Sequence, residues 1–509
     1  MSGQVDLHPP PRAGPSKKVV IVGGGLAGLA AAHTLSSTLK NVNLDIKLLE
    51  AKPYPGGRVK SVPIQDGKYF AEIGAYFLYY FNEATSFTDF LESRQLASNK
   101  TAESHNEIFT DTGIPNIHFL SNGELIQFSS AKHYEKMFAD VFDELGECYD
   151  REDWNYVIRK EWPKKNKKWQ RSDFSLDEYL ETRYFEAVEA SAPMQLPTGC
   201  TPRHIYNRMT IYERFMNGTD LANLDVSSIG ESFDPDCEYL QRANYSEIVS
   251  AISKELPPDT LQCSNVVKAI NWTEKAANSE SIPPITVHCE NGQAYDAHHV
   301  IITTSLGVLK LWASINETFS PSLPADKLEA ISKLGMGEGC SVFYEFSAPL
   351  IDKEHQVIEL FWLEEELQYL SKYPWAQSLD AFIRQKDSNV YGTWFAADKA
   401  RGIEAATNQE RIDGISLVLE KFLKKRICPT RVIIGAWTSD PHVLGVYSYC
   451  AKGSDEMDRV ALSEPVDGSS SMQLLFAGEA THVSLFGTTN GAFETGVREA
   501  KRLLEHYSI

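Results

Sequence analysis

The chain has 509 residues, of which 42% are hydrophobic and 11% are aromatic, and its formal net charge is −20. This length allows two domains with full hydrophobic cores, and the composition excludes a disordered chain. The negative charge disfavours nucleic acid as a partner and favours a small cationic ligand. No apolar run approaches the roughly 18 residues of a membrane helix, so we expect no membrane span.

The eight cysteines are scattered along the chain without a Cys-x-x-Cys pair. We therefore predict no disulfide framework, no structural zinc site and no other metal. The short apolar stretch 19–29 is rich in glycine and lacks a cleavage site, so it resembles a buried strand and turn more than a signal peptide. The last residues, 506–509, do not match the Ser-Lys-Leu peroxisomal signal, and we predict a cytoplasmic protein.

The predicted elements begin after residues 1–16, a Pro- and Gly-rich stretch that we expect to be a disordered leader. A β-branched strand at 17–23, a glycine-rich turn, an alanine-rich helix and a strand at 44–49 predict a βαβ unit. A second strand-rich region spans about residues 260–304. A third region comprises a strand at 474–478 and a helix at 491–505. The basic run 159–171 is interpreted as a solvated face in preference to an anion or nucleic-acid site.

The spacing Gly23-x-Gly25-x-x-Gly28 follows the first strand and precedes its helix. The first glycine permits a tight turn, the second lets a pyrophosphate approach the backbone, and the third permits close packing of helix and strand. The helix N-terminus adds free N–H groups and partial positive charge. Glu50, about 20 residues further on, is placed to accept hydrogen bonds from ribose hydroxyls. The pattern predicts a dinucleotide site.

The segment Pro55-Gly56-Gly57-Arg58 follows this acidic residue directly. A glycine pair followed by arginine can bring a guanidinium to the same diphosphate. A nicotinamide enzyme does not need this arrangement, so the segment indicates FAD.

Several motifs together resemble the flavin amine oxidase superfamily, and the likeness is strongest to the animal polyamine oxidases that act on spermine and N-acetylpolyamines. It extends from about residue 17 to residue 505. The motifs are Gly-Gly-Gly-Leu-Ala-Gly-Leu at 23–29, Glu50, Gly56-Gly57-Arg58, Glu72-Ile73-Gly74-Ala75, the segment 285–309, Trp437-x-x-x-Pro441-x-x-x-Gly445-x-Tyr447-Ser448-Tyr449, and Phe476-Ala477-Gly478-Glu479-Ala480-Thr481-His482.

The resemblance implies an α/β fold, in which a Rossmann-like FAD-binding domain interleaves with an α+β substrate domain. We expect the FAD-binding domain at 17–85, 211–310 and 431–509, and the substrate domain at 86–210 and 311–430. Relatives with covalent flavin carry a cysteine where this chain has Val446, so the FAD is expected to be noncovalent.

The resemblance also implies roles for individual residues. Tyr447 resembles the aromatic wall that guides the amine to the flavin, and Glu213 an acidic residue near the substrate path. Val267 is expected at the adenine, and Glu479 near the ribityl and diphosphate groups. The full set expected to bind the cofactor is Gly23, Gly25, Ala27, Gly28, Glu50, Gly57, Arg58, Tyr76, Phe77, Val267, Glu479, Thr488 and Thr489.

The chain departs from the family pattern in three places, one of which is a pair of residues, and all are expected near the active site. The first is Ser341, where polyamine oxidases carry a lysine that holds a water against flavin N5; its register follows from Leu334-Gly335-Met336-Gly337 before it. The second is the pair Phe77 and Tyr79, where the family usually has Trp and then His or Glu. The third is Asn490, where His is common. The candidate catalytic residues are Tyr447, Ser341, Tyr79 and Glu213.

The expected function is an FAD-dependent amine oxidase that acts on spermine, spermidine or their N-acetyl forms. Hydride would pass to flavin N5, and O2 would be reduced to H2O2. The reacting amine must be neutral, so activity should rise with pH. The alternative is an FAD-bound pseudoenzyme or binding protein, because Ser341 replaces the lysine. A chromatin amine oxidase is disfavoured, since no long helical insertion is evident. We expect a monomer or a weak homodimer.

Overall fold

The computed structural model describes residues 16–38, 44–80, 85–97, 116–149, 175–224, 236–239, 244–273, 283–352, 355–385, 388–466 and 472–507. The predicted leader, apart from residue 16, and the basic run 159–171 lie outside these described residues. Within the described ranges, no helix combines the length and the apolar character that crossing a bilayer requires.

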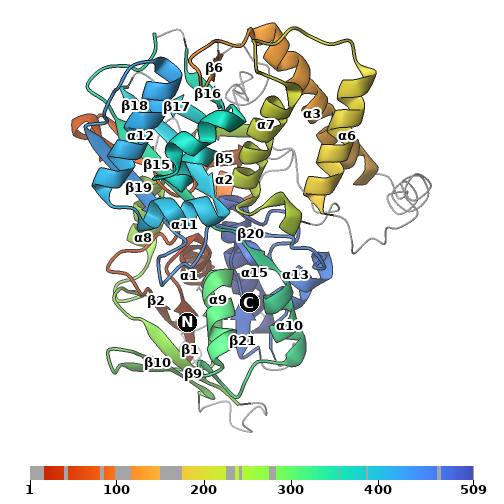
Figure 1. Cartoon of the computed structure of the whole chain (residues 1–509). Helices are drawn as coiled ribbons and strands as arrows, with labels where there is room; N and C mark the ends of the chain where they lie inside the picture. Colours follow the sequence, from red (N-terminus) through yellow and green to blue (C-terminus); the bar gives the residue numbers. More distant parts are fainter. Residues whose placement is uncertain are drawn as a thin grey trace, which may run out of the picture.

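A five-stranded parallel sheet gathers segments from three distant parts of the chain, in the order β21-β12-β1-β2-β8. Its strands are β1 (Lys17–Val22), β2 (Leu44–Leu49), β8 (Leu261–Gln262), β12 (His299–Ile302) and β21 (Leu474–Phe476). Strands β1, β2 and β21 are labelled in Figure 1. The central strands are apolar on both faces because the sheet is covered on both sides. This sheet and the order of its strands confirm the predicted α/β class.

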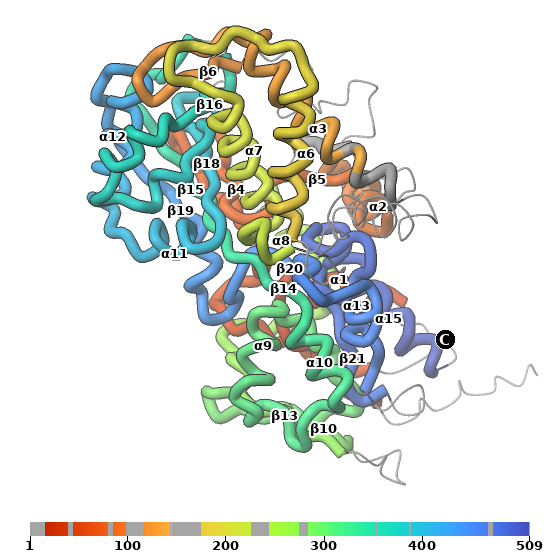
Figure 2. Tube along the Cα trace, turned by 45° about the vertical axis from the view of Figure 1, so that its right-hand side comes forward, coloured from red at the N-terminus to blue at the C-terminus, as the bar shows by residue number. Residues whose placement is uncertain are grey.

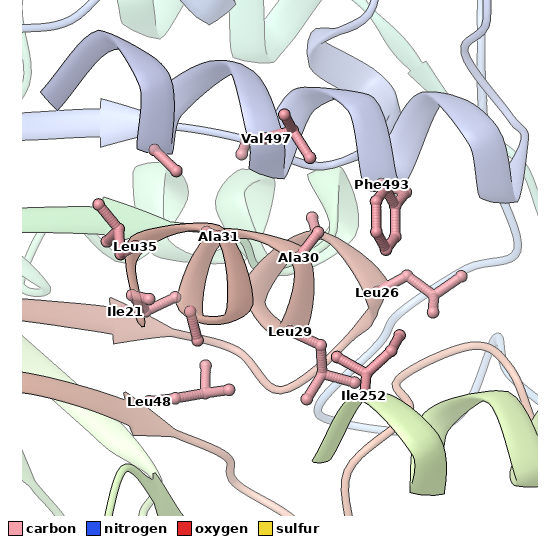
Figure 3. Close-up of a cluster of buried hydrophobic side chains, with 14 of the residues drawn as sticks. Ile21, Leu26, Leu29, Ala30, Ala31, Leu35, Leu48, Ile252, Phe493 and Val497 are labelled. Atoms are coloured by element: carbon pink, nitrogen blue, oxygen red, sulfur yellow. The ribbon is translucent and has the colours of Figure 1, made fainter. Parts of the chain in front are cut away.

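Helix α1 (Leu26–Thr38) is buried between this sheet and helix α15 (Thr489–His506). Figure 3 shows Phe493 and Val497 of α15 facing α1, with Ile252 of α8 (Tyr245–Glu255) on its other side. The two long helices approach closely because position 496 is glycine: a Cβ there would stand 2.1 Å from the carbonyl oxygen of Ala27. The core therefore fixes the helix whose N-terminus follows the glycine turn.

A second apolar core lies on the opposite face of the five-stranded sheet. It contains a four-stranded sheet in the order β11-β10-β9-β13 and three helices. The strands are β9 (Val267–Asn271), β10 (Ile285–Cys289), β11 (Ala294–Ala297) and β13 (Phe319–Ser320), and the helices are α9 (Leu306–Ile315), α10 (Ala325–Lys333) and α13 (Glu456–Ser463).

A six-stranded sheet forms the other half of the molecule, in the order β19-β15-β18-β17-β16-β6 (Figure 1). Its strands are β6 (Asn116–Leu120), β15 (Gly339–Glu345), β16 (Val357–Phe361), β17 (Ala381–Arg384), β18 (Val390–Ala396) and β19 (Arg431–Ala436). One face packs on α11 (Ala397–Ala405) and α12 (Asn408–Leu423). Helices α3 (Phe128–Tyr149), α6 (Leu176–Ala190) and α7 (Pro202–Asn217) build a separate core beside the sheet.

Shorter elements connect the two halves. Three strand pairs are β3 (Ser61–Ile64) with β4 (Tyr69–Glu72), β5 (Phe77–Tyr80) with β7 (Asp236–Tyr239), and β14 (Gly335–Met336) with β20 (Ser448–Tyr449). Helix α2 (Ser86–Ser93) contacts α15, and the short helix η8 (Glu479–Thr481) follows β21.

The predicted domain borders do not coincide with the sheets. Strand β19 was expected in the FAD-binding domain, but it pairs with β15 in the six-stranded sheet. The expected border between residues 310 and 311 divides α9 between the two domains and places α10 in the substrate domain, but both helices pack in the core of the five-stranded sheet, and Figure 2 shows them beside β13 and β21. The prediction followed changes in composition, whereas strand pairing and helix packing determine the border.

Candidate functional site

One cavity of about 1040 Å³ lies between the two halves. The glycine turn after β1 forms one end, and residues of α7, β15 and β20 form the other. Of the predicted site residues, all except Gly28 line this cavity. The predicted residues come from motifs that lie hundreds of positions apart in the sequence. The fold brings them together around one cavity.

The glycine turn forms the phosphate end of the cavity. Gly28 stands behind it, and a Cβ there would be 1.9 Å from the carbonyl oxygen of Gly23, so this position admits only glycine. The N-terminus of α1 carries no acidic side chain in its first turn, which leaves its N–H groups and partial positive charge available to an anion. The partial positive charge of the helix N-terminus and the open space at the glycine turn suit a diphosphate at this end of the cavity.

Glu50 lies beside this turn at the end of β2 and is buried. Its carboxylate accepts hydrogen bonds from the backbone N–H groups of Gly24, at 2.7 Å, and Lys52, at 2.8 Å. Burial raises its pKa, and the two backbone hydrogen bonds oppose that shift. The backbone fixes the position of the carboxylate at the cavity wall, as a ribose-binding residue requires.

Arg58, which is partly exposed, and Glu479, which is buried, form an ion pair at the cavity wall, 2.9 Å apart. Arg58 also donates to the carbonyl oxygen of Val446 at 2.7 Å. Glu479 accepts further hydrogen bonds from Oγ of Ser448 at 2.7 Å and from the N–H of Gly487 at 2.8 Å. Burial alone raises the pKa of Glu479, but the Arg58 charge and the Ser448 hydrogen bond outweigh burial and lower it.

The part of the cavity lined by α7 is a chamber with aromatic walls, and the carboxyl group of Glu213 also lines it. The hydroxyl of Tyr447 donates to the carbonyl oxygen of Phe215, and burial raises the pKa of Tyr447. Glu213 forms no ion pair within the described part of the chain, and burial raises its pKa to about 8. The aromatic side chains that line the chamber are Tyr76, Phe77, Tyr79, Phe142, Tyr212, Phe215, Trp394, Tyr447 and Tyr449.

Ser341 lies on the face of β15 opposite the residues that pack on α11 and α12, because side chains alternate along a strand. Its hydroxyl donates to the carbonyl oxygen of Ile73 at 2.6 Å, and the indole N–H of Trp437 donates to the same oxygen at 2.7 Å. The side chain borders the cavity and carries no charge. The Ser341 hydroxyl therefore uses its one donor on the backbone carbonyl of Ile73, the residue before Gly74.

The other two departures from the family pattern lie close to each other. Phe77 and Tyr79 both line the chamber, with ring centroids 6.3 Å apart. Asn490 is fully buried and does not line the cavity. Its amide donates to the carbonyl oxygen of Tyr79 at 3.2 Å and to Oγ1 of Thr85 at 3.1 Å, so it holds the strand that presents Tyr79.

Sequence reasoning missed residues that support the site from behind. Arg459 of α13 is fully buried, donates to Oγ of Ser448 at 2.9 Å, and lies 3.6 Å from the ring centroid of Phe486, a cavity residue. It extends the Arg58–Glu479 pair into a network of four side chains. Trp437 and Trp394 also border the cavity. No local motif marks Arg459, since its buried position depends on how α13 packs.

A dinucleotide cradle that opens into an aromatic chamber is typical of a cofactor-dependent oxidoreductase. The sequence matches the family model for flavin containing amine oxidoreductases over residues 26–504, and the chain belongs to this family. It is therefore a flavin-dependent oxidoreductase, and the resemblance inferred from the motifs is confirmed.

Relatives and solved structures agree with this membership. The human peroxisomal N(1)-acetyl-spermine/spermidine oxidase is 28% identical over 506 residues, which cover 96% of this chain and 94% of the relative. Polyamine oxidase 1 of Oryza sativa subsp. japonica is 33% identical over 322 residues, 57% of this chain and 61% of the relative. A putrescine oxidase bound to putrescine has the same fold, with a TM-score of 0.68 at 16% identity over 96% of this chain and 99% of that structure.

Proposed function

We propose that this chain is an FAD-dependent oxidase of polyamines: spermine, spermidine or their N-acetyl forms. The observation that carries the proposal is the placement of Glu213, a carboxyl group without a charged partner among the described residues, in the same cavity as the glycine turn. A long polyamine can place one ammonium group at this carboxylate while another nitrogen lies deeper in the chamber. The names of the human and rice relatives, and the net charge of −20, favour the same substrate class.

The cavity residues also fit FAD, bound without a covalent link. The glycine turn and Glu50 would hold the dinucleotide, the Arg58–Glu479 pair the middle of the cofactor, and Thr488 and Thr489 would contact the flavin ring. Bound FAD supplies a hydride acceptor at N5 and a route for electrons to O2, which gives H2O2. Val446 occupies the position where covalent relatives carry cysteine.

The protein side chains contribute position and environment. The aromatic walls exclude water and restrict the amine to a narrow path, and a correctly held substrate removes much of the barrier to reaction. Glu213 receives the ammonium group and ionises as it does so, because a neighbouring cation favours the charged form of a carboxyl group. The cytoplasmic location remains a prediction, and the name of the human relative includes the peroxisome.

Anaerobic mixing of the purified protein with spermine, spermidine and their N-acetyl forms tests the proposal. We expect at least one of these amines to bleach the flavin absorbance band. Absence of bleaching by all of them would support the second candidate, a flavin-bound protein without turnover. Position 341 carries a serine that is hydrogen-bonded to Ile73, so no cation lies where the family carries its lysine, and this favours the second candidate.

The Glu213→Gln variant is expected to raise KM for the preferred polyamine about 10–100-fold, with a much smaller change in kcat. The reason is the loss of one charge-assisted hydrogen bond, worth about 1.5–3 kcal/mol. Because the pKa of Glu213 in the free protein is about 8, kcat/KM should rise with pH through this value, and the variant should lose that component. Steady-state kinetics between pH 6 and 10 measure both effects, with the range set by the shift to about 8.

The same carboxyl group has a predictable effect on stability. Its pKa rises from 4.5 to about 8 on folding, so between these values the folded chain holds a proton that the unfolded chain has released. The free energy of unfolding therefore falls as pH rises through this window, and Glu213→Gln should reduce the fall. Asp220→Asn, a change just beyond the end of the same helix, serves as the control. Unchanged kinetics and unchanged pH dependence in Glu213→Gln would contradict the assigned role.

A further inference from the structure

A cluster of ionisable side chains lies outside the cavity, beside the β6–β16 edge of the six-stranded sheet. His118 of β6 and Glu359 of β16 are opposite each other in the parallel register, and both are buried. Glu135 comes from α3, which packs over this edge. One ligand atom from each of these three residues lies within 4.8 Å of the others. Nε2 of His118 is 2.9 Å from Oε2 of Glu359 and 3.9 Å from Oε1 of Glu135.

Two buried carboxylate oxygens face this point. Oε1 of Glu135 has no hydrogen-bond partner, and Oε2 of Glu359 lies beside Nε2 of His118, its ion-pair partner at 2.9 Å. The other oxygen of Glu359 is fully engaged, because Nδ2 of Asn116 donates to it at 3.0 Å and Arg208 lies 3.2 Å away. Glu359, which is 5% exposed, is thus held from one side while its second oxygen points into the cluster.

The charges of the cluster are also incompletely balanced. Three carboxyl groups, those of Glu135, Glu359 and Asp380, surround the single guanidinium of Arg208. The carboxyl groups therefore outnumber the guanidinium, and a buried carboxylate is stabilised by a positive partner or by coordination of a metal.

We propose that His118, Glu135 and Glu359 bind a zinc ion. Imidazole nitrogen and carboxylate oxygen are zinc ligands, and a tetrahedral zinc ion separates its ligand atoms by about 3.4 Å. The observed separations bracket this value, so small side-chain movements close the site. Asn116 and Arg208 orient the Glu359 carboxylate from outside, as hydrogen bonds to metal-bound carboxylates usually do. Phe128 and Phe361 flank the His118 ring, with ring centroids 5.8 and 5.7 Å away.

The zinc ion would connect parts of the chain that also form the amine end of the cavity. Helix α3 carries both Glu135 and Phe142, and helix α7 carries both Arg208 and Glu213. The ion would fasten α3 to the β6–β16 edge, and Arg208 would join α7 to the same group. The three side chains leave the fourth zinc position to a water molecule. The site lies outside the flavin cavity, and the ion would hold the wall that carries Glu213. The prediction of no zinc rested on cysteine spacing, and this cluster contains no cysteine.

Zinc binding is tested on the full flavin-loaded protein after removal of metal with a chelator. We expect Zn²⁺, added back and followed by dialysis, to remain at one equivalent per chain by elemental analysis, and to raise the melting temperature in proportion to its occupancy. Glu135→Gln should lose this zinc, while Asn116→Ala should bind it about 10–100-fold more weakly. Glu144→Gln serves as the matched control, because Glu144 lies on the same helix and pairs with Arg183 at 2.8 Å.

Two outcomes would overturn the zinc site. The first is a chain with normal flavin absorbance that takes up no zinc, which would mean that the two carboxyl groups share a proton. The second is full zinc retention in Glu135→Gln. Glu135→Gln should also keep its flavin, since Glu135 does not line the cavity. Failure of the zinc site is therefore distinguishable from failure of amine oxidation, because each has its own readout.

Discussion

The Glu479→Ala variant is expected to retain less than about a tenth of the flavin that the unaltered chain binds. Alanine removes the only carboxylate that pairs with Arg58 in the described structure and leaves the donors of Ser448 and Gly487 without an acceptor. Removing the buried carboxylate leaves Arg58 without its ionic partner, and the loss is concentrated where the middle of the cofactor would lie. Flavin content is measured as the ratio of visible to protein absorbance after gel filtration.

Two further variants are needed to interpret the flavin content of Glu479→Ala. Glu479→Gln keeps the shape and one acceptor oxygen, so its flavin content should be intermediate. Glu494→Gln changes an acidic residue of α15 that accepts a hydrogen bond from Ser86 at 3.0 Å and does not line the cavity, and it should bind flavin normally. Normal flavin content in Glu479→Ala would show that the network around Arg58 does not support the cofactor.

The Ser341→Lys variant is expected to increase the rate of amine oxidation about tenfold or more, or to create activity if the unaltered chain has none. Ser341 borders the cavity on the strand face opposite α11 and α12, so a lysine would project toward the same space. An ammonium group there can position a water molecule for proton transfer, and positioned acid–base groups contribute about 10²–10⁴-fold in other enzymes. Stopped-flow reduction and reoxidation of the flavin show which half-reaction changes.

Ser341→Met is the matched control, since its side chain has similar length and no charge. Both variants lose the hydrogen bond to Ile73, so any shared loss of stability is separated from the effect of the charge. Equal rates in the two variants, with flavin bound in both, would contradict the assigned register or the value of a cation at this position.

The sequence allowed prediction of the parts of the fold that depend on local pattern. The βαβ unit, the glycine turn and Glu50 are close in the chain, and their spacing carries its own physical reason. The cavity lining was also largely predicted, because the family motifs mark Arg58, Tyr447 and Glu479. The pairing of Arg58 with Glu479 was not, since both residues had been interpreted only in relation to the cofactor.

Features made by distant packing escaped prediction. Arg459 becomes part of the site only when α13 packs behind Ser448, and its neighbours in the sequence carry no sign of this contact. The cluster of His118, Glu135 and Glu359 likewise forms when β6 and α3, which are neighbours in the chain, meet β16 more than 200 positions further on. The pairing of β19 with β15 also escaped prediction for the same reason, because the sheet to which a strand belongs depends on contacts with distant segments.

The proposed function requires a flavin nucleotide that is held without a covalent bond in the cavity between the glycine turn and Tyr447. Denaturing the purified protein with acid and quantifying the flavin in the supernatant tests this directly. We expect one FAD per chain, all of it released. A colourless, folded protein that takes up no FAD on reconstitution would contradict the cofactor assignment, and flavin that precipitates with the chain would contradict noncovalent binding.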